Sequence, residues 1–180
     1  MNGLQLSAAF HSDEMMKKYF YGCFMNKDVS TDLVRKNNGF FVLNTLEAIG
    51  GIGHWVLFFI DENRLYFFDS LGNEPEYYGG DIERLYRICK YRKSIVFAIP
   101  VQHPKSSVCG AYVLFFAYHM VRKKSVHKIK SYFTRFKGMN DRVVTRFTNK
   151  FLNIEKTCNH AFCQAYMFYE NCAPYCKCKL

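Results

Sequence analysis

Two apolar runs separated by a three-residue polar turn constrain the fold of this chain more than any other feature. The first run, HWVLFFI, begins at His54, and the second, RLYFF, begins at Arg64. Both are rich in aromatic and β-branched residues, and the residues between them, DEN, are typical of a turn. We therefore predict a β-hairpin with His54 at the start of one strand and Asp69 at the end of the other.

Helical and extended patterns flank this hairpin. The predicted helices are Asp13–Phe24 (with Ser12 as its N-cap), 81–91, 109–121 and 141–152, and the predicted strands are Gly39–Leu46 and Ser94–Pro100. The stretch that begins at Cys109 is apolar and long enough to be a buried helix. We expect residues 1–180 to form a single α+β domain with a central mixed or antiparallel sheet, catalytic motifs within 44–122 and a basic helical part over 123–180.

Composition and hydropathy narrow the class of protein. Hydrophobic residues make up 49% of the chain, which excludes a disordered chain. The longest apolar runs, Val56–Ile60 and Ala111–Tyr118, are much shorter than the ~18 residues of a membrane span. Charges interrupt the N-terminal segment where a signal peptide would be apolar, so we expect no membrane association and no secretion by the usual route. The eight cysteines are then expected to be mostly reduced thiols.

Three residues suited to thiol catalysis stand at the ends of predicted elements. Cys109 opens a helix, whose N-terminal N–H groups and dipole stabilise a thiolate. His54 can take the thiol proton and later give it to a leaving amine. Asp69, at the same end of the hairpin as His54, can fix the tautomer and orientation of the imidazole. The set predicts a catalytic triad of Cys109, His54 and Asp69.

Gln102 precedes Cys109 by seven residues in a polar loop. Its side-chain amide and the Cys109 backbone N–H would together form an oxyanion hole. Each residue also has a purely structural interpretation, because free cysteines are often buried as small apolar residues and aspartates are common in turns. His103, beside Gln102, His119 and His127 are alternative bases by residue type.

Positive charge is concentrated in the last third of the chain. The net charge is +10, and between residues 122 and 156 the basic residues are opposed only by Asp141 and Glu155. Such a one-sided field attracts polyanions, although a solvated helix face is the simpler interpretation. The residues predicted to bind double-stranded DNA are Arg122, Lys123, Lys124, Lys128, Lys130, Arg135, Lys137, Arg142 and Arg146.

The C-terminal tail is rich in cysteine. It contains Cys158, His160, Cys163, Cys172, Cys176 and Cys178. A zinc site is the alternative interpretation of this tail. The spacings C-x4-C and C-x3-C-x-C fit no standard structural zinc pattern, so we predict no metal site.

Two segments resemble the adenovirus protease (adenain) family. One is NTLEAIGGIGHWVLFFIDENRLYFF, residues 44–68, with the DSLG that follows it. The other is QHPKSSVCG, in which Gln102 stands seven residues before Cys-Gly. The sequence YFYG at 19–22 is similar to the start of the same enzymes. The match runs from about residue 19 to residue 122, roughly the first two-thirds of the chain.

This resemblance implies a papain-like cysteine protease fold with His54 as base, Asp69 as orienting acid, Gln102 as oxyanion donor and Cys109 as nucleophile. The adenovirus enzyme has Glu where this chain has Asp69. The resemblance also implies a viral endopeptidase, or one of a virus-like mobile element, that cleaves capsid or core precursors near glycine-containing sites during virion maturation. Its location would be the virion and the nucleus or cytoplasm of the infected cell.

Partners and activators follow from the same resemblance. Related enzymes act on DNA and are activated by a short viral peptide linked to a cysteine, for which Cys89 is the nearest candidate. No cofactor is required for the chemistry, and we expect a monomer.

Two other classes stay open. The DSLG at 69–72 is closer to SUMO-specific and other ubiquitin-like-protein proteases, which usually have Asp where this chain has Val108. A non-catalytic, basic DNA-packaging protein with a degenerate protease fold would bind polyanions but have an unreactive Cys109.

Overall fold

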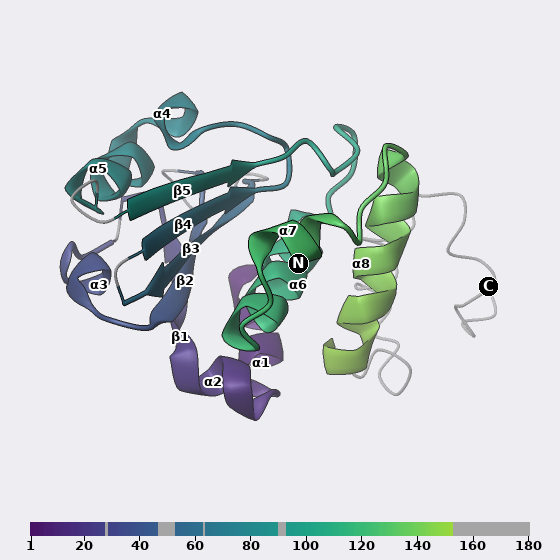
Figure 1. Ribbon diagram of the computed structural model, residues 1–180, viewed down its shortest axis with the longest axis horizontal. Coiled ribbons are helices and arrows are strands. Elements are labelled where there is room, and N and C mark those ends of the chain that lie inside the picture. The colour runs from purple at the N-terminus through teal and green to yellow at the C-terminus, as the bar shows by residue number, and fades with distance from the viewer. Residues whose placement is uncertain (28, 47–52, 63, 90–92, 153–180) are drawn as a thin grey trace.

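The computed structural model describes residues 1–152 apart from 28, 47–52, 63 and 90–92. A five-stranded mixed sheet lies at its centre, with the strands arranged in sequence order (Figure 1). The strands are β1 (Phe20–Met25), β2 (Gly39–Asn44), β3 (Trp55–Asp61), β4 (Arg64–Asp69) and β5 (Lys93–Ala98). The outer pairs, β1–β2 and β4–β5, are parallel, whereas β2–β3 and β3–β4 are antiparallel.

The predicted hairpin is confirmed as β3 and β4. Its register pairs Asp61 with Arg64 beside the turn and Leu57 with Phe68 near the far end of the ladder. Asp69 is the last residue of β4, and His54 immediately precedes β3. Both residues therefore lie at the open end of the hairpin, because antiparallel strands bring the start of one strand to the end of the other.

Helices cover both faces of the sheet (Figure 1). One face carries α1 (Gly3–His11), α2 (Glu14–Tyr19), α6 (Cys109–Val121), α7 (Val126–Lys130) and α8 (Lys137–Leu152). The other face carries α3 (Asp32–Arg35), α4 (Pro75–Tyr78) and α5 (Gly80–Ile88). The α+β class with a mixed sheet flanked by helices is thus confirmed.

The two faces explain why the strands are apolar without alternation. In β2, Phe40 and Val42 belong to the core beneath α6, while Phe41 and Leu43 belong to the core beneath α5. Successive side chains of a strand point to opposite faces, so a strand covered on both sides must be apolar at every position.

Helix α6 is the centre of the larger core, and it has the bounds predicted for the buried helix. Its ring contacts include Phe116, which stacks on Phe68 of β4 with centroids 3.8 Å apart. Packing against the sheet fixes the depth of the helix and therefore the position of its first residue, Cys109.

The predicted helix over Asp13–Phe24 is wrong in its second half. The helix α2 ends at Tyr19, and residues 20–25 form β1 as a parallel neighbour of β2. The predicted N-cap, Ser12, instead ends α1, a helix that the sequence patterns did not indicate, while the Asp13 side chain caps α2 by accepting from Met16 N at 3.0 Å. Aromatic residues at 20–24 favour the strand, but its partner lies some twenty residues away and outside any local pattern.

The described residues contain neither a candidate membrane span nor a candidate metal-binding cluster. None of the helices in this part of the chain combines the length and apolar character needed to cross a membrane. No group of three or more His, Cys, Asp or Glu side chains gathers within these same residues in a metal-binding arrangement. The cysteine-rich tail at 158–178, considered above as a zinc site, lies outside the described residues.

Candidate active site

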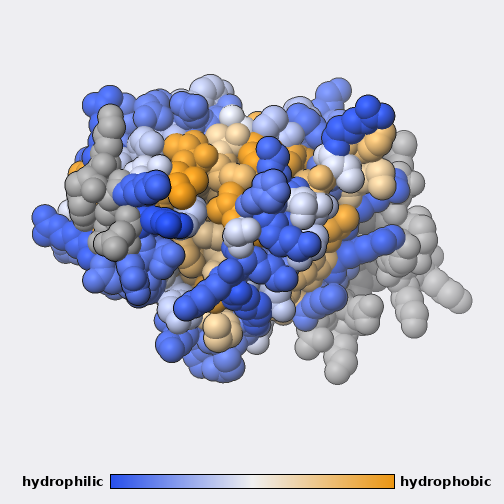
Figure 2. Space-filling view, in the orientation of Figure 1, coloured by the Kyte–Doolittle hydropathy of each residue, from blue (hydrophilic) through white to orange (hydrophobic). Residues whose placement is uncertain are grey.

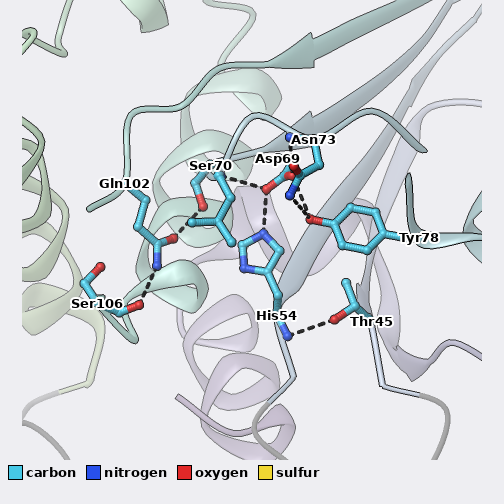
Figure 3. A network of polar contacts seen from close by, with 9 residues as sticks. Thr45, His54, Asp69, Ser70, Asn73, Tyr78, Gln102 and Ser106 are labelled. Carbon is cyan, nitrogen blue, oxygen red and sulfur yellow. Dashed lines mark hydrogen bonds and ion pairs between the residues drawn. The ribbon is translucent and has the colours of Figure 1, made fainter. Parts of the chain in front are cut away.

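The structure brings Asp69 and His54 together at the open end of the hairpin. His54 Nε2 lies 2.5 Å from Asp69 Oδ1 (Figure 3). The His54 backbone is held as well, because its N–H donates to Thr45 Oγ1 at 3.0 Å and its carbonyl accepts from Thr45 N at 2.8 Å. Thr45, directly after β2, therefore fixes the backbone of His54, and Asp69, at the end of β4, fixes its imidazole.

Asp69 is fully buried and its carboxylate is saturated with donors. Besides His54, the backbone N–H groups of Leu71 and Asn73 and the hydroxyl of Tyr78 each donate to it at 2.8 Å (Figure 3). Burial alone would raise the pKa of Asp69, but the hydrogen bond and positive charge of His54, together with these donors, lower the pKa below its usual value. Asp69 is thus an ionised acid that orients the histidine.

Cys109 is the first residue of α6 and its side chain is almost completely buried. Its thiol interacts with the His54 side chain, and each of the two groups shifts the pKa of the other. Since Asp69 occupies Nε2 of the imidazole, Nδ1 is the nitrogen that remains for the thiol. The three predicted triad residues are therefore connected in the order Cys109, His54, Asp69.

The electrostatics of the pair favour a thiolate beside an imidazolium. Burial by itself lowers the pKa of His54, but hydrogen bonds to Asp69 and Cys109 and their negative charges raise it to about 9. Burial by itself raises the pKa of Cys109, and the hydrogen bond and positive charge of His54 lower it overall. By contrast, burial raises the pKa of Cys23 to about 12, because no cation compensates there.

Gln102 lies in the loop before α6, buried, with both ends of its amide hydrogen-bonded. Its Oε1 accepts from Ser70 Oγ at 2.7 Å and its Nε2 donates to Ser106 O at 2.8 Å (Figure 3). The loop is also tied to α8, because the backbone N–H of His103 donates to Asp141 Oδ1 at 3.3 Å. The predicted oxyanion donor is therefore held by hydrogen bonds at both ends of its amide.

The three alternative bases have other surroundings, and His127 is exposed in α7. The Nδ1 atom of His103 accepts from the backbone of Lys105 at 3.3 Å within its own loop. His119 lies in the core side of α6, stacked on Tyr132, where burial and the charges of Lys124 and Arg122 lower its pKa to about 4. Among the described residues, His54 is the histidine placed to serve Cys109.

Three residues around the site were not singled out as functional from the sequence. Tyr78, from α4, donates to Asp69 and stacks on the His54 ring with centroids 6.2 Å apart. Ser70 holds Gln102, and Thr45 holds the His54 backbone. The Ser70 position follows Asp69 directly and could have been found from the DSLG motif, but nothing in the sequence distinguishes Tyr78 from the other tyrosines.

The basic residues predicted to bind DNA lie in the turn after α6, in α7, in the segment between α7 and α8, and in α8, elements that can be followed in Figure 1. Lys123, Lys128, Lys130, Arg135, Arg142 and Arg146 are exposed, and Arg122, Lys124 and Lys137 are half-buried. Arg122 is engaged within the fold, since it donates to Asp13 Oδ2 at 2.7 Å and stacks on Tyr118. In Figure 2 hydrophilic side chains alternate with apolar ones on this face rather than forming one continuous surface.

Cys89, the nearest candidate for linking an activating peptide, ends α5 and is fully buried in the smaller core. That location does not favour a role in linking an external peptide.

No family model matches the chain, and no curated protein matches it. The relationship to the adenovirus protease family therefore stays a prediction from the two motif segments.

Proposed function

We propose that this chain is a cysteine endopeptidase with Cys109 as nucleophile, His54 as general acid–base and Asp69 as orienting acid. One observation carries the proposal: the His54 imidazole, whose side chain is 11% exposed, is hydrogen-bonded to the Asp69 carboxylate and interacts with the Cys109 thiol at the N-terminus of a helix. This is the arrangement that thiol catalysis of acyl transfer requires.

The reaction proceeds in two acyl-transfer steps. The Cys109 thiolate attacks the peptide carbonyl carbon, and the carbonyl oxygen becomes an oxyanion that accepts hydrogen bonds from the Gln102 side chain and the Cys109 backbone N–H. The imidazolium of His54 protonates the leaving amine as the C–N bond breaks, which leaves a thioester on Cys109. His54 then takes a proton from the water that attacks the thioester, the carboxylic acid is released, and Cys109 leaves as the thiolate, which restores the thiolate–imidazolium pair.

The substrate class rests on the motifs. The resemblance of residues 44–72 and 102–110 to the adenovirus protease family supports a papain-like fold and cleavage near glycine in viral capsid or core precursors. Double-stranded DNA, attracted by the exposed lysines and arginines of α7 and α8, would be a partner and an activator. A protease specific for ubiquitin-like proteins is the second candidate, and the DSLG sequence after β4 favours it.

The test is labelling with a thiol-reactive peptide that ends in Gly-Gly, read by mass spectrometry of the intact and digested protein. Wild type is expected to be labelled only at Cys109, and the variants Cys109→Ala and His54→Ala are expected to be unlabelled. Cys23→Ala is the matched control and should be labelled like wild type, since the raised pKa of Cys23 keeps it a thiol.

Each other outcome selects an alternative. An unlabelled wild type, with and without DNA, would reject the peptidase and favour the non-catalytic DNA-packaging protein. Labelling that persists in His54→Ala would show a reactive cysteine without a catalytic base. If Cys109 is labelled, cleavage of a SUMO fusion in preference to glycine-containing precursor peptides would favour the second candidate.

A further inference from the structure

The Gln102 amide can act as an oxyanion donor in only one of its two orientations. A carboxamide has an acceptor end and a donor end of nearly the same shape, and rotation by half a turn exchanges them. With the NH2 group toward the reacting carbonyl, the amide stabilises negative charge, whereas with the oxygen there it opposes that charge. What holds this amide in place is therefore part of how the site works.

The hydrogen-bond partners settle which end is which. Ser106 O is a backbone carbonyl and can only accept, so the group 2.8 Å from it must be the NH2 of Gln102. Oε1 then faces Ser70, and the hydroxyl 2.7 Å away must be donating. Ser106 O takes one of the two Nε2 hydrogens, and the second is left without an acceptor among the described residues.

We infer that Ser70 is a positioning residue of the oxyanion hole, and that its hydroxyl holds the donor end of the Gln102 amide toward the reacting carbonyl. This inference rests on the proposed function. Ser70 is placed for the task by backbone contacts, because its carbonyl accepts from Gln102 N at 3.0 Å and the carbonyl of Asp69 accepts from Ile99 N at 3.1 Å.

Burial makes this contact decisive. Ser70 is 0% exposed and Gln102 is 2% exposed, so water does not replace a lost partner without cost. Without the Ser70 hydroxyl, Oε1 would lose its donor while Ser106 O would still oppose the flipped amide. The amide would therefore become less ordered rather than invert, and its interaction with the oxyanion would weaken.

Two adjacent residues at the end of β4 thus support both proton transfer and oxyanion stabilisation. Asp69 orients the imidazole that carries the proton, and Ser70 orients the amide that carries the oxyanion charge. Consecutive side chains can serve different partners because they leave the backbone in different directions where the strand ends.

The experiment compares Ser70→Ala with wild type in three assays: peptide hydrolysis, inhibition by a peptide aldehyde, and alkylation of Cys109 by iodoacetamide. The thiolate adds to the aldehyde carbon, and the former carbonyl oxygen then occupies the oxyanion position, whereas alkylation involves no oxyanion. We expect Ser70→Ala to lower kcat and weaken aldehyde binding about tenfold, with KM and the alkylation rate within about twofold of wild type. Ser131→Ala, a serine on the surface at the end of α7, is the matched control.

A double-mutant cycle separates positioning from a general structural effect. Gln102→Ala is expected to lower kcat by about 10²–10³, and adding Ser70→Ala to it should cause no further loss. A Ser70→Ala protein with wild-type kcat and aldehyde affinity would overturn the inference. So would an equal loss in the Gln102→Ala background, or a parallel loss of the alkylation rate.

A variant that does not fold and a protein without the proposed activity would give different results. If Ser70→Ala does not fold, the comparison uses Ser70→Thr and Ser70→Val instead. Threonine and valine have the same shape as each other, and only threonine has a hydroxyl. Equal aldehyde affinities of these two variants would overturn the inference. Failure of the proposed function looks different, since wild type would then show neither hydrolysis nor selective alkylation of Cys109.

Discussion

The network around His54 and the basic segment from Arg122 to Arg146 differ in the burial of their polar side chains. Around the histidine, Asp69, Ser70 and Gln102 are buried, and each has hydrogen-bond partners of its own. In the basic segment most of the cations are exposed, on α7, α8 and the turns beside them, while Arg122 contacts Asp13 and Tyr118.

Burial decides how closely the position of a polar side chain limits its role. A buried polar group must be hydrogen-bonded, so its position limits its role to the few partners that surround it. An exposed cation contributes to a field that falls off with distance and is screened by salt, and no single position is decisive. The catalytic proposal can therefore be tested residue by residue, and the DNA proposal only through collective charge.

The largest expected effect would come from Asp69→Asn. The asparagine keeps the shape but removes the negative charge that stabilises the imidazolium, and its NH2 group would face donors from which the carboxylate now accepts, so we expect turnover to fall by ~10³–10⁴. Peptide hydrolysis measures the loss. Asp61→Asn, an exposed position on the same hairpin, should leave turnover unchanged. A melting temperature close to that of wild type would show that the loss is not unfolding, and a decrease of less than about fivefold would contradict the triad.

The second expected effect is a split between two pH profiles. Because the pKa of His54 is raised to about 9, the imidazolium is present below that pH and is lost above it. Turnover needs the imidazolium to protonate the leaving amine, so it should fall about tenfold per pH unit above 9. Alkylation of Cys109 needs only the thiolate and should not fall there.

The acid side of the same experiment supplies its control. The lowered pKa of Cys109 predicts that its alkylation continues well below pH ~8.5, where an ordinary thiol slows. Cys23, with its pKa raised to about 12, should stay unreactive over the whole range. Turnover that keeps rising beyond pH 9, or two cysteines with the same alkylation profile, would show that the thiolate–imidazolium pair does not form.

The smallest expected effect belongs to the basic segment. Replacing Lys128 and Lys130 by glutamine should lower the salt dependence of DNA binding by ~0.9 per lysine and weaken binding several-fold, while hydrolysis without DNA stays within about twofold. Lys17→Gln with Lys18→Gln, two exposed lysines of α2, is the matched control. Equal effects of the two pairs in a fluorescence binding titration would mean that only net charge matters and that the segment is not a DNA site.

Local sequence patterns were sufficient for the central elements. The hairpin of β3 and β4 and the helix that begins at Cys109 were predicted because each is an apolar run bounded by polar residues. The same patterns missed β1, which was included in a helix, because β1 pairs in parallel with β2 across an intervening segment. They also missed α1, although its Asn2 and Gln5 form a capping box.

The order of residues along the chain sets which chemical groups are available: a histidine before one strand, an acid after the next, an amide in a loop and a thiol at the start of a helix. Only the tertiary structure decided that Asp69 binds Nε2 of His54, that Tyr78 supports this carboxylate and that Ser70 sets the orientation of Gln102. The physical reason is the distance along the chain between the residues that interact. Strands and helices follow from neighbouring residues, whereas a hydrogen bond between Ser70 and Gln102 exists only after β5 has joined the sheet and returned the chain to the end of β4.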